Sequence, residues 1–403
     1  MLDRRQFLGG FAAMTLAAPR IGHAADPVGV TASEIRIGNT MPYSGPNSAY
    51  GVIGRTEQAF FRMVNEQGGI AGRKINFITY DDGFSPPKTV EQVRRLVDQD
   101  RVAFLFNTLG TPTNSAVVRY LNQRKVPHLF LATGADKWGT YQETPWTMGW
   151  QPSYRTEAQI YARHLMANKP EAKLAILYQN DDFGKDYLAG VRDILGAERF
   201  DRTVRTASFE VTDPTPDSQI VSLQATGADA FLIAAGPKAA AQTIRKVHDI
   251  GWRPLQYLTN VSLSVGAVMQ PAGPEKGIGT ITSGYLKEQG DPAWAEDAGM
   301  GEFREFLKQW FPNADPADSN TLYGYAVSLT LMQVLRQCDG DFSRESVMKQ
   351  AASLNGLALP VLLPGILVKT SPTNFHPIRS MQLQRWEGRS WQRFGGLIEG
   401  AGS

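Results

Sequence analysis

The chain has 403 residues, of which 42% are hydrophobic and 20% charged, with 41 basic and 39 acidic side chains. Such a chain is too long for a single hydrophobic core and suggests two domains of ordinary globular composition. The near balance of charge excludes the concentrated basic surface that nucleic acid or an anionic membrane requires of a partner.

The first 24 residues are predicted to be an export signal. They contain the pair Arg4-Arg5, an apolar stretch over residues 7–18 and a small-residue end at residues 22–24, the layout of a cleaved signal peptide. The string RRQFL is similar to the twin-arginine motif, with an ordinary secretory signal as the alternative. Cleavage near Ala24 removes three arginines and one aspartate and leaves 38 residues of each sign.

The mature chain is expected to be a free periplasmic protein. No later stretch is long and apolar enough to span a bilayer, so no membrane insertion is expected. The only cysteine, Cys338, has no second thiol to pair with and is far from the predicted cleavage point, so neither a disulfide nor a lipid anchor is expected. We also expect a monomer.

From residue 34 onward, short apolar runs alternate with amphipathic stretches. The predicted strands cover residues 34–42, 74–82, 102–107 and 126–132, and the predicted helices cover residues 55–69, 87–100 and 112–125. Near-continuous apolar strands separated by helices indicate a parallel sheet covered on both faces.

The same pattern restarts near Ser153. Strands are predicted over residues 173–180, 206–212, 229–236 and 255–260, and helices over residues 156–170, 183–196, 215–227 and 238–251. Residues 90–134 and 217–262 repeat one order of helix, strand and small-residue loop with few identities, which predicts two similar α/β lobes.

After Gly284 three helices are predicted in succession, followed by three strands. The helices cover residues 294–311, 320–338 and 343–354, and the strands cover residues 363–369, 379–386 and 391–395. These elements complete both lobes only if the chain crosses between them repeatedly, near residues 148–152, 281–286 and 368–372.

The predicted fold class is therefore α/β, with two Rossmann-like lobes built on parallel sheets and joined by a hinge of three crossovers. The first lobe is assigned residues 33–150 and 284–368, and the second lobe residues 151–283 and 369–398. Such a hinge favours closure of the two lobes on each other, and ligands of such sheets bind at the carboxyl ends of the strands.

No catalytic or metal-binding motif was found. The sequence lacks a G-x-S-x-G elbow, an H-E-x-x-H pair, a Walker loop and a strand-linked G-x-G-x-x-G, and its histidines do not have metal-ligand spacing. The pairs Asp81-Asp82 and Asp181-Asp182 follow strands and precede glycine, which favours turn and helix capping. We expect no enzyme activity, no cofactor and no metal.

One loop is suited to holding an anion. NTLGTPTNS follows the strand over residues 102–107 and precedes a helix, whose first backbone N–H groups are unpaired and carry partial positive charge. The loop has no lysine at its end, and a similar loop, LATGAD, follows the next strand. Both features favour a carboxylate over a phosphate.

Three motifs carry a family likeness: MPYSGPNSAYG, NEQGGIAGRKINFITYDDGFSPPKTVEQVRRLV and LYQNDDFGKDYLAGV. With the order of strands and helices, they resemble the type I periplasmic binding proteins of branched-chain amino acid ABC transporters. The likeness covers nearly the whole mature chain. It implies two lobes that close on a solute and present it to a permease in the inner membrane.

The resemblance also implies a binding site. Carboxylate-binding positions of the family fall on Asn107, Thr108, Ala132 and Thr133, and the aromatic positions on Tyr50 and Phe183. In the second lobe, amino-acid-binding members have an acidic residue for the ammonium group. Here the matching position is Asn260, and the preceding second-lobe loop AAGPK, which contributes Gly236 to the predicted site, has no acidic residue.

This departure bears on the solute. An ammonium group buried without a carboxylate partner costs several kcal/mol, which favours an aromatic or aliphatic acid without an amino group. If Asp182 serves as the counter-ion of the ammonium group instead, a hydrophobic amino acid is also a candidate solute. Two other functions also stay open: a sensor subunit for a membrane receptor, and an exported amide or ester hydrolase.

Overall fold

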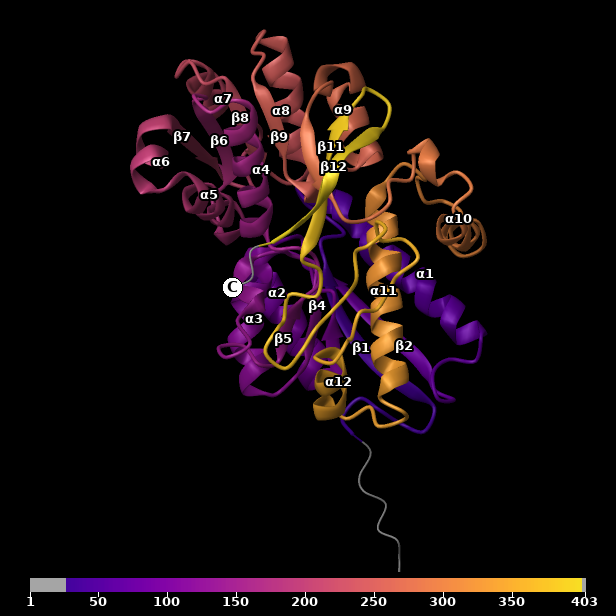
Figure 1. Ribbon diagram of the computed structural model, residues 1–403. Helices are drawn as coiled ribbons and strands as arrows, with labels where there is room; N and C mark the ends of the chain where they lie inside the picture. The colour runs from indigo at the N-terminus through magenta and orange to yellow at the C-terminus, as the bar shows by residue number, and fades with distance from the viewer. Residues whose placement is uncertain (1–26, 401–403) are drawn as a thin grey trace, which may run out of the picture.

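The alternation of apolar runs and amphipathic stretches produces two β-sheets in the computed structural model, which describes residues 27–400. Each sheet is the core of one lobe, and Figure 1 shows the two lobes one above the other. We call the lobe with the five-stranded sheet the first lobe and the lobe with the seven-stranded sheet the second lobe. The predicted export signal lies outside the described residues.

The five strands of the first sheet are all parallel and run in the order β2-β1-β3-β4-β5. They are β1 (Glu34–Met41), β2 (Lys74–Asp81), β3 (Phe104–Phe106), β4 (His128–Leu131) and β5 (Thr147–Gly149). The helices between them are α1 (Gly51–Glu66), α2 (Pro86–Arg94) and α3 (Thr111–Gln123).

Apolar side chains alternate across β3 to fill both faces of this sheet. Leu105 packs with Val93 of α2 and Leu121 of α3. Phe104 and Phe106 belong to the larger core on the other face, where Phe61 of α1 meets Phe106 edge-on at 5.9 Å. A strand buried on both faces reads as a continuous apolar run, which is why VAFLF predicts this strand.

The second sheet has the order β12-β11-β10-β9-β8-β6-β7. Its parallel strands are β6 (Leu174–Gln179), β7 (Val204–Phe209), β8 (Ala230–Ala234), β9 (Leu255–Leu258) and β10 (Ile281–Gly284), and its antiparallel strands are β11 (Ser380–Trp386) and β12 (Trp391–Glu399). Its helices are α4 (Tyr154–Asn168), α5 (Asp182–Leu195), α6 (Ala197–Thr203), α7 (Asp217–Gln224), α8 (Pro237–Asp249) and α9 (Gln270–Ala272).

Three further helices follow β10: α10 (Ala298–Trp310), α11 (Ser319–Gln337) and α12 (Arg344–Ala351). Both α10 and α11 pack on α1 of the first lobe, and α12 packs on α11. The chain therefore passes from the first sheet to the second after β5, returns after β10, and passes again to β11. These three passages agree with the predicted hinge.

The prediction of a strand over residues 363–369 is wrong. This segment contributes one isolated bridge, between Leu357 and Val368. It contains Pro364, which lacks an N–H donor, and Gly365, whose φ of 88° is far from extended backbone. The second sheet also departs from a purely parallel one, because β11 and β12 extend it as a hairpin.

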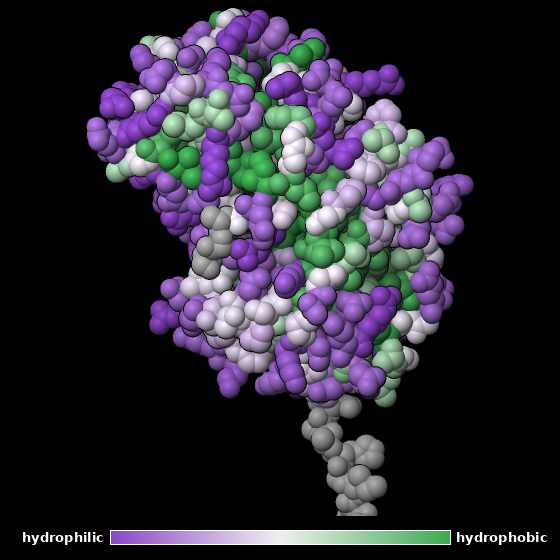
Figure 2. Space-filling model, viewed as in Figure 1, coloured by the Kyte–Doolittle hydropathy of each residue, from purple (hydrophilic) through white to green (hydrophobic). Residues whose placement is uncertain are grey.

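Among residues 27–400, no helix is both long and apolar enough to cross a membrane. Figure 2 shows a face that is largely hydrophilic, with hydrophobic side chains gathered around the junction of the two lobes.

Candidate ligand-binding site

A cleft lies between the lobes, where the carboxyl ends of strands from both sheets face each other. The space between its atoms, open solvent included, amounts to about 950 Å³. The first lobe and α11 contribute Asn47, Tyr50, Ile53, Phe84, Leu109, Gly110, Thr111, Ala132, Ser319, Asn320 and Tyr323. The second lobe and the crossover segments contribute Gln151, Tyr154, Gln179, Phe183, Gly236, Asn260, Val261, Leu263, residues 284–288 and Gln384.

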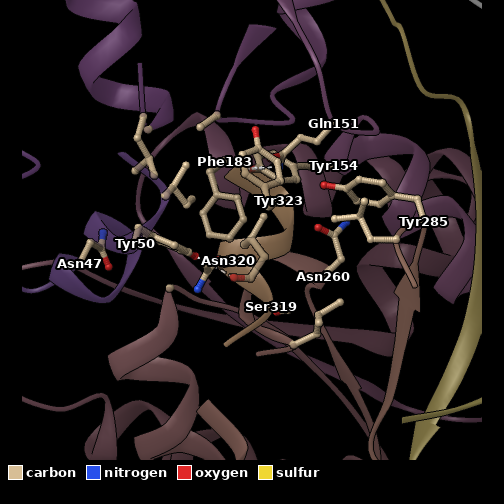
Figure 3. Close-up of a pocket in the computed structure, with 18 of the residues that line it drawn as sticks. Asn47, Tyr50, Gln151, Tyr154, Phe183, Asn260, Tyr285, Ser319, Asn320 and Tyr323 are labelled. Carbon is tan, nitrogen blue, oxygen red and sulfur yellow. Dashed lines mark hydrogen bonds between the residues drawn. The ribbon is translucent and has the colours of Figure 1, made fainter. Parts of the chain in front are cut away.

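Aromatic rings form much of the cleft wall (Figure 3). Tyr154, in the first turn of α4, meets Phe183 of α5 edge-on with ring centroids 4.8 Å apart. Tyr323 and Tyr285 are held from behind by Trp150, at centroid distances of 5.1 and 5.9 Å. A wall of packed aromatic rings suits a solute with an apolar body.

The two lobes touch across this cleft. The Tyr50 hydroxyl, carried just before α1, donates to the backbone carbonyl of Val261 in the second lobe at 3.0 Å. Beside it, the backbone N–H of Gly266 donates to the carbonyl of Ala317 at 2.9 Å. These hydrogen bonds join elements of opposite lobes, so the structure has the lobes closed.

Replacing Tyr50 with phenylalanine is expected to weaken solute binding by removing the hydroxyl that joins the lobes while keeping the ring. One hydrogen bond of about 0.5–1.5 kcal/mol corresponds to a Kd raised roughly 2- to 12-fold. Titration calorimetry measures this change, with Tyr178→Phe in β6 as the matched control. A Kd equal to that of the wild type in Tyr50→Phe would contradict this role of the hydroxyl.

Five of the residues predicted from the sequence line the cleft: Tyr50, Ala132, Phe183, Gly236 and Asn260. They come from four separate loops and one helix start that the strand order brings to the same place. Gly236 faces the other lobe so closely that a Cβ atom on it would lie 2.6 Å from Oδ1 of Asn47.

The structure places the predicted residues Asn107 and Thr108 outside the cleft. Asn107 has a positive φ of 50°, which turns its amide inward to donate to the carbonyl of Phe130 at 2.5 Å. The Thr108 hydroxyl lies 2.6 Å from Asn114 and 2.5 Å from His128. Both side chains are fully buried. Their donors are bonded within the protein, while Oδ1 of Asn107 has no partner among the described residues.

Thr133 and Asp182 also lie outside the lining. The Thr133 hydroxyl is 2.6 Å from the hydroxyl of Thr111 and accepts the backbone N–H of Ala135. Asp182 is half exposed and pairs with Lys137 at 2.7 Å, which lowers the pKa of its carboxyl. Its carboxylate thus has a cationic partner outside the cleft.

The capping roles predicted for the acidic pairs are confirmed for Asp81, Asp82 and Asp181, whereas Asp182 pairs with Lys137. Asp81 accepts the backbone N–H of Gly83 at 3.0 Å. Asp181 caps α5 by accepting the backbone N–H of Gly184 at 3.3 Å. Asp82 accepts the N–H of Phe84 and the hydroxyl of Thr89, both at 2.9 Å.

Sequence reasoning missed Thr111, which lines the cleft at the start of α3. Either hydroxyl can donate in the contact between Thr111 and Thr133. Thr133 already accepts the N–H groups of Ala135 and Trp138, and when it donates to Thr111 the Thr111 proton is free to donate into the cleft. The signal was present, since Thr111 belongs to the loop that the sequence singles out as an anion site.

Sequence reasoning also missed Glu157, whose carboxyl is fully buried on α4 and contacts Asn260. Its oxygens accept the backbone N–H of Asn260 at 2.7 Å and the Asn260 side-chain amide at 2.8 Å. Burial raises the pKa of Glu157 to about 7, against the lowering effect of these and other hydrogen bonds. A glutamate in an amphipathic helix gives no sequence signal of such a position.

Two charged residues of the crossover segment reach the cleft. The ammonium group of Lys287 lies 2.7 Å from both oxygens of Asp297 and 2.6 Å from the carbonyl of Pro360, so its charge is already paired. Glu288 is buried to 7% exposure, with one oxygen that has no hydrogen-bond partner, and burial raises the pKa of its carboxyl.

Comparison with known proteins gives one consistent result. The family profile described as "Periplasmic binding protein" matches residues 34–390. "Leu/Ile/Val-binding protein homolog 7" of Brucella suis biovar 1 is 22% identical over 365 residues, which cover 88% of this chain and 90% of that protein.

Solved structures also share the fold. A branched-chain amino acid ABC transporter protein from Thermus thermophilus with bound valine has a TM-score of 0.81 at 12% identity, covering 92% of this chain and 98% of that one. A fatty acid ABC transporter substrate-binding protein from Thermomonospora curvata has a TM-score of 0.75 at 22% identity, covering 92% and 94%. The type I arrangement of two α/β lobes is thus shared.

Proposed function

The chain belongs to the periplasmic binding protein family, and from this premise we propose that it is a receptor for a small carboxylate with a hydrophobic body. The observation that carries the proposal is the cleft itself, which is lined by residues of both lobes and bridged by the Tyr50 hydroxyl and the carbonyl of Val261. A solute held there touches both lobes and stabilises the closed state by its greater affinity for that state.

We assign the carboxylate of the solute to the first-lobe end of the cleft. Gly110 and Thr111 at the start of α3 and Ala132 after β4 meet there. Pro112 has no N–H, but the backbone N–H groups of Thr111 and Thr113 have no partner within α3, and the helix dipole favours an anion at this point. The Thr111 hydroxyl supplies a further donor.

Thr111→Val is therefore expected to weaken binding of every carboxylate solute. A hydrogen bond to a charged group contributes about 1.5–3 kcal/mol, which is a rise in Kd of roughly 10- to 150-fold. Titration calorimetry measures the rise, with Thr226→Val as the control, because Thr226 lies between α7 and β8 and does not line the cleft. Equal Kd values for the wild type and Thr111→Val would rule out this position of the carboxylate.

Hydrophobic side chains surround the remaining space, among them Phe84, Leu109, Phe183 and Leu263. They suit either a hydrophobic amino acid or an aromatic or aliphatic acid. The relatives support this range, since one binds valine and another is named for fatty acids.

A thermal-shift panel of amino acids and of aromatic and aliphatic acids tests the proposal on protein freed of ligand. A solute at one hundred times its Kd adds about 2.7 kcal/mol to the free energy of unfolding, so the unfolding midpoint rises for at least one member. A flat response across the panel would overturn the proposal.

We further propose that the protein is exported, loses its signal near Ala24 and delivers the solute to an ABC permease. The hinge divides the chain into residues 33–150 with 284–368 and residues 151–283 with 369–398, and only the closed form is presented to the permease. Mass spectrometry of the periplasmic fraction tests the cleavage. Stimulation of the permease ATPase by the solute-loaded receptor, and not by the ligand-free one, tests delivery.

A further inference from the structure

A buried carboxylate lies behind the second-lobe end of the cleft. Glu157 of α4 has no exposed surface, and five donor groups lie within hydrogen-bond distance of its two oxygens; the Tyr161 hydroxyl also has the carbonyl of Leu258 as an acceptor at 2.8 Å. The donors are the hydroxyls of Tyr161 and Tyr187, the backbone and side-chain N–H groups of Asn260 at 2.7 and 2.8 Å, and the hydroxyl of Ser283 at 3.1 Å.

The donors around Glu157 favour its ionised form and burial opposes it; with its pKa raised to about 7, the carboxyl is mostly ionised at pH 8. Backbone and amide N–H groups only donate, so both Glu157 oxygens act as acceptors toward Asn260. Several donated hydrogen bonds favour an ionised carboxylate. Within residues 27–400, no lysine, arginine or histidine forms an ion pair with Glu157, so its charge lacks a cationic partner.

The contact with Glu157 also fixes the orientation of the Asn260 carboxamide. Because the amide nitrogen donates to the carboxylate, the amide oxygen is turned away from it. Asn260 lines the cleft, as Figure 3 shows, and its Oδ1 accepts no hydrogen bond from the described residues. The second lobe thus presents an acceptor to the solute, backed by a negative charge.

Among the described residues that line the cleft, no unpaired cation offsets that charge. Lys287 is paired with Asp297, and Glu288 adds a second carboxyl to the lining. An apolar solute end placed here would leave the acceptor on Asn260 without a donor, and an anionic end would be repelled.

We infer that Glu157 is a positioning residue for solute recognition: it aims the oxygen of Asn260 into the cleft and makes this end selective for a hydrogen-bond donor, a protonated amine above all. The inference rests on the proposed function and narrows it to solutes that carry an amino group beside the carboxylate. Position 260 has no acidic side chain. The negative charge comes instead from Glu157 of α4, which acts on the solute through Asn260.

Matched pairs of solutes test this inference by titration calorimetry at pH 8. Leucine is compared with 4-methylpentanoate and phenylalanine with 3-phenylpropanoate, because each pair differs only in the amino group. For the pair that fits the cleft, the wild type is expected to prefer the amine by about 10-fold or more, the value of a hydrogen bond to a charged group. Glu157→Gln is expected to reduce the preference below about 3-fold.

A swap variant distinguishes this role from a merely structural one. In E157Q/N260D the carboxylate and the amide exchange places, so the preference for the amine is expected to return. Glu57→Gln is the matched control, because Glu57 of α1 is equally buried and does not line the cleft; it is expected to keep the wild-type preference. If Glu157→Gln does not fold, Asn260→Ala is measured in its place and is expected to lose the preference for the amine.

The outcomes separate this inference from the proposed function. If both members of a pair bind and Glu157→Gln, or Asn260→Ala in its place, keeps the wild-type preference, the inference is overturned and the proposed function stands. The same holds if the wild type prefers the member without the amine. If no carboxylate of the panel binds the wild type, the proposed function fails and the inference fails with it.

Discussion

Replacing Trp150 with alanine is expected to lower the free energy of unfolding by about 3–5 kcal/mol, the usual cost of truncating a buried tryptophan or phenylalanine. Trp150 has no exposed surface, and its indole N–H donates to the hydroxyl of Thr330 at 3.0 Å. Its ring meets Tyr323 at 5.1 Å and Tyr285 at 5.9 Å. The truncation therefore removes the support of two cleft-lining side chains at the first crossover.

Urea unfolding of the ligand-free protein measures this effect. Trp150→Phe is the matched control, because it keeps an aromatic ring against both tyrosines and loses mainly the hydrogen bond to Thr330. We expect Trp150→Phe to retain most of the stability, and the alanine variant also to bind solute more weakly. A loss below about 1 kcal/mol in Trp150→Ala would show that Trp150 does not support the junction.

Replacing Gly236 with leucine is expected to raise the Kd for solute by roughly 30- to 1,000-fold, which corresponds to about 2–4 kcal/mol. The leucine would overpack against Asn47 of the opposite lobe and against the solute in the cleft. A Cβ atom here would lie 2.6 Å from Oδ1 of Asn47, which is a buried residue of the opposite lobe. The rest of the leucine would occupy space in the cleft. The φ of −67° at Gly236 is one that leucine adopts without strain.

The two lobes of Gly236→Leu are expected to fold normally, because the overlap arises only when they close. Ligand-free protein should therefore unfold at the wild-type midpoint, while calorimetry shows the loss of affinity. Gly396→Leu in β12 is the control, since no atom lies within 4 Å of its Cβ position. Wild-type affinity in Gly236→Leu would mean that the closed contact between Asn47 and Gly236 is not needed for binding.

Periodicity in the sequence predicted the two-lobed α/β fold and the three crossovers because long buried strands and amphipathic helices leave strong patterns. The strands β5 (TMG) and β10 (ITSG) were not predicted, because threonine, serine and glycine interrupt their apolar pattern; the equally short β3 and β4 were predicted from their continuous apolar runs. The apolar run over residues 363–369 was misassigned, since its hydrophobicity outweighed the proline and glycine within it.

The candidate site was predicted only in part, for a geometric reason. The loop after β3 was correctly selected, but the choice between Thr108 and Thr111 depends on the positive φ values of Asn107 and Gly110, 50° and 102°. These angles turn one hydroxyl into the core and the other into the cleft. Glu157 escaped prediction because it meets Asn260 across 103 positions of sequence, a proximity that only the folded sheet creates.

The central claim is that a solute binds between the lobes and closes them. Small-angle X-ray scattering of ligand-free wild-type protein, before and after addition of the tightest solute of the calorimetric panel, tests it most directly. The account predicts that the radius of gyration falls on saturation to the value calculated for the closed structure. A solute that saturates the protein and leaves the radius of gyration unchanged from the ligand-free value would contradict it.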